Sequence, residues 1–156
     1  MEIFATGDVL AFIGMGLMIG LSGLGASIGA GMTGAAAVGV MKKRPEAFGN
    51  ALVLACVPTT QALYGFVGFI VFQGFLGGGS IDVLKGAITL GAGIALGLVC
   101  CISCIQQAKT CTHGISAIAS GVDALGKTLI LAAVPEFFAI LSLVATILLA
   151  SYSLVA

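Results

Sequence analysis

Hydrophobic residues form four long tracts in this chain, and nearly all charged residues lie between them. The tracts run over Val9–Met41, Ala47–Ile81, Gly86–Ala108 and Thr128–Ala156. A helix needs about 20 predominantly apolar residues to cross a bilayer, so each tract can supply one transmembrane helix. The first two tracts exceed one span, so we expect their helices to project from the bilayer or to end in glycine-rich turns such as Gly77–Gly79. The pattern predicts an all-α membrane protein with four transmembrane helices.

The second half of the chain repeats the first at an offset of 77 residues. The segment Leu52–Pro58, LVLACVP, aligns with Leu129–Pro135, LILAAVP, and five of the seven positions are identical. The same offset places Gly14, Gly16 and Gly20 on Gly91, Gly93 and Gly97 without a gap. An even number of spans in each copy makes the copies parallel rather than inverted. We predict two duplicated helical hairpins, over residues 1–78 and 79–156.

Composition and charge place the protein in the membrane. Of its 156 residues 60% are hydrophobic and 8% are charged, and the net charge of zero gives no indication of a nucleic-acid partner. The basic turn Lys42–Arg44 and the connection that carries Lys109 and Lys127 lie on one side, whereas the opposite side has only Lys85. Because cytoplasmic loops are richer in Lys and Arg, we expect both hairpin turns in the cytoplasm and both termini outside.

Small residues concentrate in the first and third predicted helices. The glycines in question are Gly20, Gly23, Gly25, Gly29, Gly31 and Gly34 in the first, and Gly86, Gly91, Gly93 and Gly97 in the third. Glycines three and four residues apart let helix backbones approach closely. We therefore predict that these two helices pack tightly on the inside, that the bulkier second and fourth helices face lipid, and that identical copies assemble into a ring.

The cysteines do not have the spacing of a metal site. On a helix that turns about 100° per residue, Cys104 and Cys111 share a face, but His113 points to nearly the opposite side. These residues, even with Cys101, cannot surround one zinc ion tetrahedrally. We expect instead that Cys100, Cys104 and Cys111 are small buried thiols at a close helix contact.

Glu136 interrupts the fourth tract, where a charge is costly. An ionised group at bilayer depth costs roughly 2.5–3.5 kcal/mol on insertion scales. Glu136 lies nine positions after Lys127, which is about 13 Å along a helix, so a short glutamate does not reach the interface. In the first repeat the corresponding residue is Thr59. We infer one functional carboxylate for every four helices, one that binds or moves an ion.

Polar side chains accompany two prolines that should kink the second and fourth helices. Thr59, Thr60, Gln61 and Tyr64 follow Pro58, Glu136 follows Pro135, and the third helix carries the pair Gln106-Gln107. Each proline removes a backbone hydrogen bond and frees a carbonyl. Carboxylate, amide, hydroxyl and carbonyl oxygens are ligands for a hard cation. A proton carrier needs fewer such oxygens, and the glutamines could instead join helices by hydrogen bonds.

Taken together, these features resemble a known family over essentially the whole chain. A duplicated hairpin, a glycine-rich first helix, the segment PTTQALYG at 58–65 and a lone glutamate in the fourth helix are similar to the proteolipid (K/c-type) subunits of V/A-type rotary ATPases, most closely those of the bacterial sodium-translocating type. The resemblance implies that Glu136 carries the ion. It implies side-chain oxygen ligands from Gln61, Thr60 and Gln107, the backbone carbonyl of Val57 as a further ligand, and a hydrogen bond from Tyr64 to the carboxylate.

The function implied is that of a non-catalytic rotor subunit in the cell membrane. Its partners would be identical copies in a ring, a stator membrane subunit with a buried arginine, central-stalk subunits and the lipid bilayer. The transported ion would be Na+, with H+ as the alternative, and no organic cofactor is expected. Two other classes of function compete with this one: a small proton-coupled exporter, which needs an aromatic-lined cavity, and a purely structural pore-forming proteolipid.

Overall fold

The structure, a computed structural model, describes residues 6–77 and 79–152. The helices are α1 (Thr6–Lys43), α2 (Phe48–Cys56), α3 (Thr60–Leu76), α4 (Val83–Ala119) and α5 (Leu125–Tyr152), with short 3-10 turns η1 (Pro45–Ala47) and η2 (Val57–Thr59). Glu2, residue 78 at the boundary of the predicted hairpins and the last four residues of the fourth tract lie outside the described residues.

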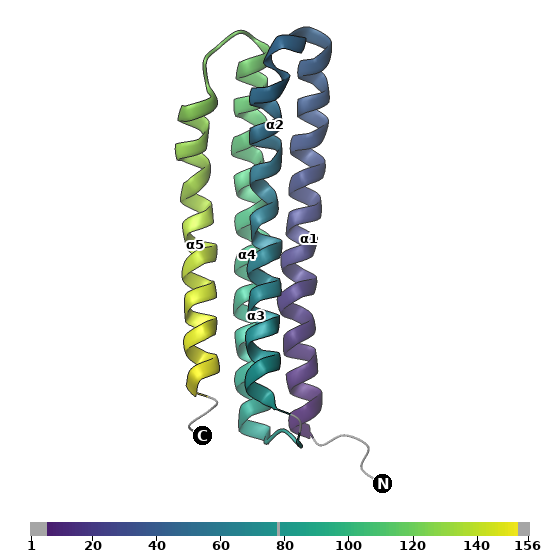
Figure 1. Ribbon diagram of the computed structural model, residues 1–156, viewed down its shortest axis with the longest axis vertical. Coiled ribbons are helices and arrows are strands. Elements are labelled where there is room, and N and C mark those ends of the chain that lie inside the picture. Colours follow the sequence, from purple (N-terminus) through teal and green to yellow (C-terminus); the bar gives the residue numbers. More distant parts are fainter. Residues whose placement is uncertain (1–5, 78, 153–156) are drawn as a thin grey trace.

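The helices form four antiparallel rods, because α2, η2 and α3 together make the second one (Figure 1). The α1–α2 and α4–α5 turns lie at one end of the bundle and the α3–α4 turn lies at the other. Across residues 6–77 and 79–152, four stretches are long and apolar enough to cross a membrane. The predicted all-α fold with four transmembrane helices is confirmed.

The third predicted helix is longer than its apolar tract. The tract ends at Ala108, but α4 continues through Lys109 and His113 to Ala119, 37 residues in all. At 1.5 Å per residue this is roughly 55 Å, well beyond a hydrocarbon core of about 30 Å. Charge alone does not end a helix. The helix ends just before Gly121, whose φ of 94° lies in the left-handed region that favours glycine.

The tightest packing in the bundle joins α1 to α4. A Cβ atom added to Gly25 would lie only 2.5 Å from the Cα of Cys101, and one added to Gly14 would lie 2.7 Å from the Cα of Leu90. From the other side, a Cβ atom on Gly93 would overlap the backbone of Gly14. The predicted close pair of glycine-rich helices is therefore present within one chain. Other glycines of the same two helices have no atom within 4 Å of the added Cβ, namely Gly16, Gly20, Gly23, Gly31, Gly34, Gly39 and Gly91.

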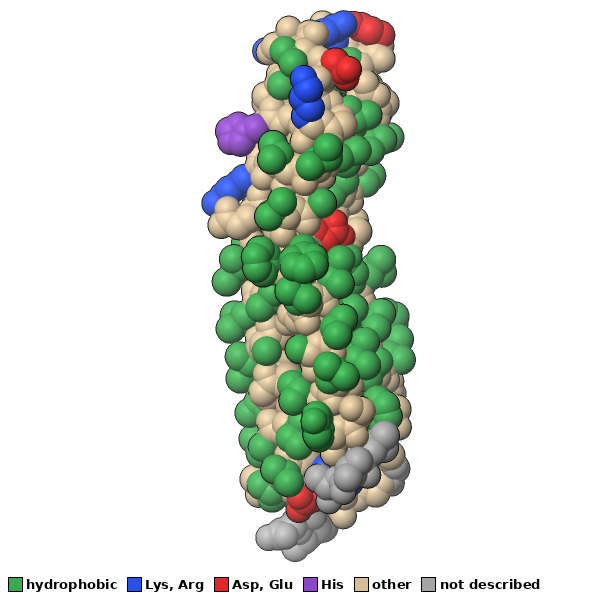
Figure 2. Space-filling model, turned by 90° about the vertical axis from the view of Figure 1, so that its left-hand side faces the viewer, with side chains coloured by type: hydrophobic (Ala, Val, Ile, Leu, Met, Phe, Trp, Pro, Cys, Tyr) green, Lys and Arg blue, Asp and Glu red, His purple; other side chains and the backbone are tan. Residues whose placement is uncertain are grey.

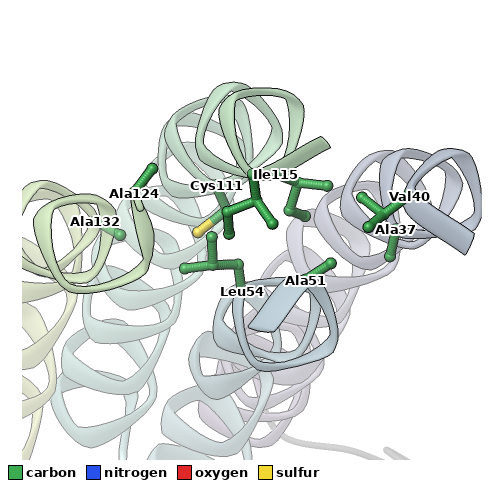
Figure 3. Packing of buried hydrophobic residues seen from close by; sticks show 9 residues of the cluster. Ala37, Val40, Ala51, Leu54, Cys111, Ile115, Ala124 and Ala132 are labelled. Carbon is green, nitrogen blue, oxygen red and sulfur yellow. The ribbon is translucent and has the colours of Figure 1, made fainter. Parts of the chain in front are cut away.

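Buried side chains between the rods are small or medium-sized. In one cluster Leu54 from α2 and Cys111 and Ile115 from α4 point toward one another (Figure 3). Cys100, Cys104 and Cys111 are buried free thiols, as predicted. Within the described part of the chain no three His, Cys, Asp or Glu side chains gather as a metal cluster. The surface on the α5 side is mostly hydrophobic (Figure 2), as expected of a protein surrounded by lipid.

The two prolines act differently although they occupy equivalent positions in the repeat. Pro58 has a non-helical ψ of 35° and separates α2 from α3, whereas Pro135 lies inside the continuous helix α5. At the break, three carbonyls accept hydrogen bonds from side chains. Thr33 donates to the carbonyl of Ala55 at 2.9 Å, Thr59 donates to that of Cys56 at 2.8 Å, and Cys104 donates to that of Pro58 at 2.8 Å. Side-chain donors from α1, η2 and α4 thus satisfy carbonyl oxygens around the break.

Candidate ion-binding site

Glu136 lies on α5, twelve residues into the helix, and is half-buried against α3 and α4. Three neutral groups donate hydrogen bonds to its carboxylate. Thr60 Oγ1 and Tyr64 Oη each donate to Oε1 at 2.8 Å, and Gln107 Nε2 donates to Oε2 at 3.0 Å. Both carboxylate oxygens are therefore held, and by side chains from two different helices. This fixes the orientation of a group that the bilayer would otherwise disfavour.

The two buried glutamines orient each other. Gln107 Nε2 faces two acceptors, the carbonyl of Ala132 at 2.9 Å and the Glu136 carboxylate, so this atom must be the amide nitrogen. The Oε1 atom of Gln107 consequently accepts from Gln61 Nε2 at 2.8 Å. The Oε1 atom of Gln61 then faces Thr60, whose Oγ1 lies 3.3 Å away. One carboxylate thus determines the orientation of both amides.

The Thr60 hydroxyl stands among three acceptor oxygens. Its Oγ1 lies 2.8 Å from Glu136 Oε1, 3.3 Å from Gln61 Oε1 and 3.4 Å from the Val57 carbonyl oxygen. A hydroxyl has one proton to donate, and the shortest contact, to the carboxylate, uses it best. The Val57 carbonyl also accepts the backbone N–H of Thr60, so its second lone pair and the Gln61 Oε1 atom face the Thr60 hydroxyl beside the carboxylate without receiving its proton. A cation would stabilise such an arrangement.

Within the described part of the chain, no basic side chain forms an ion pair with Glu136. Among residues 6–77 and 79–152 the ion pair that forms is Arg44 with Glu46, at 2.8 Å, in the exposed α1–α2 turn. The contacts of Glu136 are hydrogen bonds from neutral donors. An ionised Glu136 would therefore be a net charge at its site, and a bound cation or proton would neutralise it.

The structure brings together all six residues named from the sequence. Glu136, Thr60, Tyr64, Gln107, Gln61 and the Val57 carbonyl form one connected set of polar groups. Gln106 is exposed, whereas its neighbour Gln107 is buried. Thr59 is exposed and bonds to its own helix, so the residue that corresponds to Glu136 in the first repeat has no part in this set.

Ser103 belongs to the site although it was not predicted from the sequence. Its hydroxyl donates to the carbonyl of Pro135 at 2.7 Å, and Gln61 Nε2 donates to the Ser103 hydroxyl oxygen at 3.5 Å. The signal was available, because Ser103 precedes Gln107 by four residues and so shares its face of the helix. In sequence, however, a serine among apolar residues and cysteines looks the same as one that bonds only to its own helix.

The fold and the site define a small multi-pass membrane protein, a proteolipid, with one carboxylate surrounded by hydrogen-bonding side chains. The family model that describes the C subunit of ATP synthase matches residues 13–72 and again residues 90–149, so the second match begins and ends 77 residues after the first. The chain belongs to this family.

Two curated relatives specify the family further. The V-type sodium ATPase subunit K of Enterococcus hirae is 38% identical over 144 residues, which cover 92% of this chain and 91% of the relative. The A-type ATP synthase subunit K of Methanocaldococcus jannaschii is 37% identical over 142 residues, which cover 90% of this chain and 61% of the relative. The chain is thus a non-catalytic, ion-translocating proteolipid of a V/A-type rotary ATPase. These matches favour the rotor over the exporter and the structural pore.

Proposed function

We propose that this rotor protein carries Na+ across the membrane on Glu136. The observation that carries the proposal is the group of oxygens around Thr60, in which two acceptors and a carboxylate share one hydroxyl proton. Glu136 would supply the charge, and Thr60, Gln61 and the Val57 carbonyl would supply neutral oxygen ligands. Gln107, whose Nε2 donates to Glu136 in this structure, would turn its amide to offer Oε1 as a further ligand when the ion binds. Tyr64 would hold the carboxylate in place. The similarity to a protein named for a sodium ATPase agrees with this assignment.

The spacing of the oxygens supports a cation of this size. Ca²⁺, which has nearly the same ionic radius as Na+, keeps its oxygen ligands at about 2.3–2.6 Å. Two ligands at right angles around such an ion lie about 3.4 Å apart. The separations from Thr60 Oγ1 to Gln61 Oε1 and to the Val57 oxygen are 3.3 and 3.4 Å. These oxygens could therefore be neighbouring ligands of one ion without a large rearrangement.

Charge neutralisation would couple ion binding to rotation. An identical set of sites, one on each copy in the ring, would load Na+ from a half-channel in a separate stator subunit. A loaded, neutral Glu136 could then pass along the lipid, whereas an empty carboxylate could not do so cheaply. A buried arginine of the stator would pair with the emptied carboxylate, and central-stalk subunits would connect the ring to the ATP-hydrolysing part of the complex.

Protons are the second candidate for the transported ion. The observation in their favour is that three neutral donors already orient the Glu136 carboxylate. A protonated carboxyl would need no further oxygen ligand to be neutral. The proton alternative leaves the convergence of Gln61 and Val57 oxygens on Thr60 without a use, and for this reason we prefer Na+.

Orientation in the membrane follows from the positive-inside rule. Each of the two hairpins, residues 1–78 and 79–156, would have its turn in the cytoplasm. The two termini of the chain and the α3–α4 turn would lie on the outer side of the membrane. The variants Val122→Cys, in the α4–α5 turn, and Ser80→Cys, in the α3–α4 turn, place thiols at exposed positions at opposite ends. A membrane-impermeant maleimide should label Ser80→Cys in intact cells and Val122→Cys in inverted vesicles. The reverse pattern would contradict the orientation.

The ion assignment is tested by chemical labelling of Glu136. A hydrophobic carbodiimide should modify this carboxyl in the assembled ring, and Glu136→Gln should abolish the labelling. Added Na+ should slow the reaction at fixed pH, most clearly at pH 7 to 8 where few protons compete, whereas the same concentration of K+ or choline should not. Labelling that responds to pH but not to Na+ at pH 7 to 8 would assign the rotor to protons.

A further inference from the structure

An open groove of about 360 Å³ lies between α4 and α5 beside the ion site. Its walls include Val99, Ile102, Ser103 and Gln106 from α4 and Pro135 and Phe138 from α5. Pro135 immediately precedes Glu136, and Ser103 is hydrogen-bonded to the Pro135 carbonyl. Whatever fills this groove therefore touches the backbone that positions the carboxylate.

The first repeat contains the same groove, and there it is filled. Shifted by 77 residues, the lining becomes Ser22, Gly25, Ala26 and Gly29 of α1 with Pro58 and Gln61 of the second rod. Three residues of α4 occupy this position. Cys101 lies against Gly25, and a Cβ on Gly29 would lie 3.0 Å from Cys104 Sγ and 3.3 Å from Ala108 Cβ. Cys104 also donates to the Pro58 carbonyl at 2.8 Å.

The counterparts of these three residues in the first repeat lie on the exposed surface of α1. By the same offset Cys101, Cys104 and Ala108 correspond to Leu24, Ser27 and Gly31. Leu24 is 50% exposed and Ser27 is exposed, with its hydroxyl bonded only to the Leu24 carbonyl of its own helix. No atom lies within 4 Å of a Cβ built on Gly31. The chain thus has an open groove between α4 and α5. It also has, on the exposed side of α1, a surface equivalent to the part of α4 that fills the corresponding groove in the first repeat.

The glycines of α1 and α4 show the same relation along the rest of the contact. Gly14, Gly93 and Gly97 are each in backbone contact across the α1–α4 interface. Their counterparts in the other repeat, Gly91, Gly16 and Gly20, have no atom within 4 Å of a built Cβ. In each of these pairs one glycine contacts the partner helix inside the chain, and the other has open space beside it. Gly91 of one chain and Gly16 and Gly20 of another could therefore form the same kind of close helix contact between two chains.

We propose that α1 of the next copy in the ring docks in the groove between α4 and α5, with Leu24, Ser27 and Gly31 facing α4 and Pro135. The contact is head-to-tail, and its repetition generates a ring when the rotation between copies closes, which is where this inference rests on the proposed rotor function. Ile102 stands where Gly25 stands inside the chain, so the next copy's α1 lies farther from α4 than the chain's own α1 does. The open groove provides the room for this larger separation.

The docked helix adds a hydrogen bond beside the ion site. Cys104 donates to the Pro58 carbonyl inside the chain, and the corresponding pair across the junction is Ser27 of the next copy and the Pro135 carbonyl. That carbonyl already accepts from Ser103 and has a second lone pair. The backbone next to Glu136 is then held from both sides, and the neighbouring copy completes the surroundings of the site.

Cross-linking of paired cysteines tests the register of this contact. Gly31→Cys and Gln106→Cys reproduce across the junction the Gly29–Ala108 pair of the chain interior. In the double variant, a short bifunctional thiol reagent should link copies into dimers and higher multimers on a denaturing gel. The matched control combines Gly31→Cys with Val99→Cys, which lies on the same groove but about 10 Å farther along α4. The single variants measure background from the native cysteines.

The expected result is cross-linking of the Gln106 pair well above the Val99 pair. Equal cross-linking of both pairs, or none in rings that remain assembled, would overturn the proposal. If the Gly31 variants do not assemble, the pair Ile13→Cys with Gly91→Cys tests the same register near the other end of the interface. Cross-linking does not require ion transport and can be repeated with Glu136→Gln, so its failure would not be confused with a wrong ion assignment.

The Ser27 hydrogen bond has its own test. Ser27→Ala removes the donor, and Ser27→Cys supplies the residue that performs the corresponding role at position 104. Ser27→Ala should lower the temperature at which the purified ring dissociates in detergent, and Ser27→Cys should restore it toward the wild-type value. A Ser27→Ala ring as stable as the wild type would remove the hydrogen bond from the proposal.

Discussion

Gln61→Leu separates a sodium site from a proton site because Gln61 does not touch the carboxylate. Its Oε1 lies 3.3 Å from Thr60 Oγ1, and its Nε2 donates to Gln107 at 2.8 Å. Leucine is close to glutamine in size and suits this fully buried position. The substitution therefore removes one proposed cation ligand while Thr60, Tyr64 and Gln107 can still hold Glu136.

The expected loss of sodium affinity in Gln61→Leu follows from comparing the sodium-bound protein with the sodium-free protein. The hydrogen bond from Gln61 to Gln107 is lost with and without the ion, so its loss largely cancels. The missing Oε1 ligand affects the sodium-bound state alone, and an unsatisfied buried polar partner costs about 1–3 kcal/mol. At about 1.4 kcal/mol per factor of ten, sodium affinity should fall by about 5- to 150-fold.

The assay is the sodium concentration that halves carbodiimide labelling of Glu136 at fixed pH. That concentration should rise in Gln61→Leu by the factor given above, while labelling in the absence of sodium continues. Gln106→Leu is the matched control, because it makes the same chemical change at an exposed position outside the site. This control should behave like the wild type.

Two outcomes would refute the reasoning. If Gln61→Leu and Gln106→Leu need the same sodium concentration for protection, Gln61 is not a ligand and the oxygens around Thr60 do not bind the ion. If Gln61→Leu abolishes labelling even without sodium, the substitution has disturbed Glu136 itself, and the premise that the carboxylate keeps its other donors is wrong.

Three further predictions follow from the same structure. Glu136→Gln should leave the ring assembled but stop ion transport and the coupled ATPase activity of the complex, as measured in reconstituted vesicles; transport at the normal rate would exclude Glu136 as the carrier. Gly25→Ala should destabilise the chain by about 1–3 kcal/mol through overlap with the Cys101 backbone, whereas Gly39→Ala, with open space around it, should be neutral or stabilising because alanine favours helix; equal melting temperatures of the two variants in detergent would contradict the packing. Pro58→Ala should allow α2 and α3 to join, shift the Val57 and Thr60 oxygens and weaken sodium protection more than Pro135→Ala, which leaves the already continuous α5 unchanged; equal effects would mean that the break at η2 does not shape the site.

The hydrophobic pattern and the internal repeat were sufficient to predict the architecture. In a bilayer every span must satisfy its own backbone groups, so an apolar tract of sufficient length can hardly be anything but a helix. The family, too, was indicated by the sequence, because a glutamate in an apolar tract and PTTQALYG after a duplicated hairpin form a specific combination. The C-terminal end of α4 is the exception. Its extension to Ala119 depends on the absence of a helix breaker rather than on hydropathy.

The contacts between helices could not be read from the sequence. The spans are apolar nearly all round, so the pattern does not say which side of a helix meets which neighbour. Only the packed structure separates buried Gln107 from exposed Gln106, the broken helix at Pro58 from the continuous one at Pro135, and the glycines in contact from those left open. Ser103 was missed for the same reason. Its role is a hydrogen bond to a carbonyl on another helix, and that distance is decided by how closely the rods pack against one another.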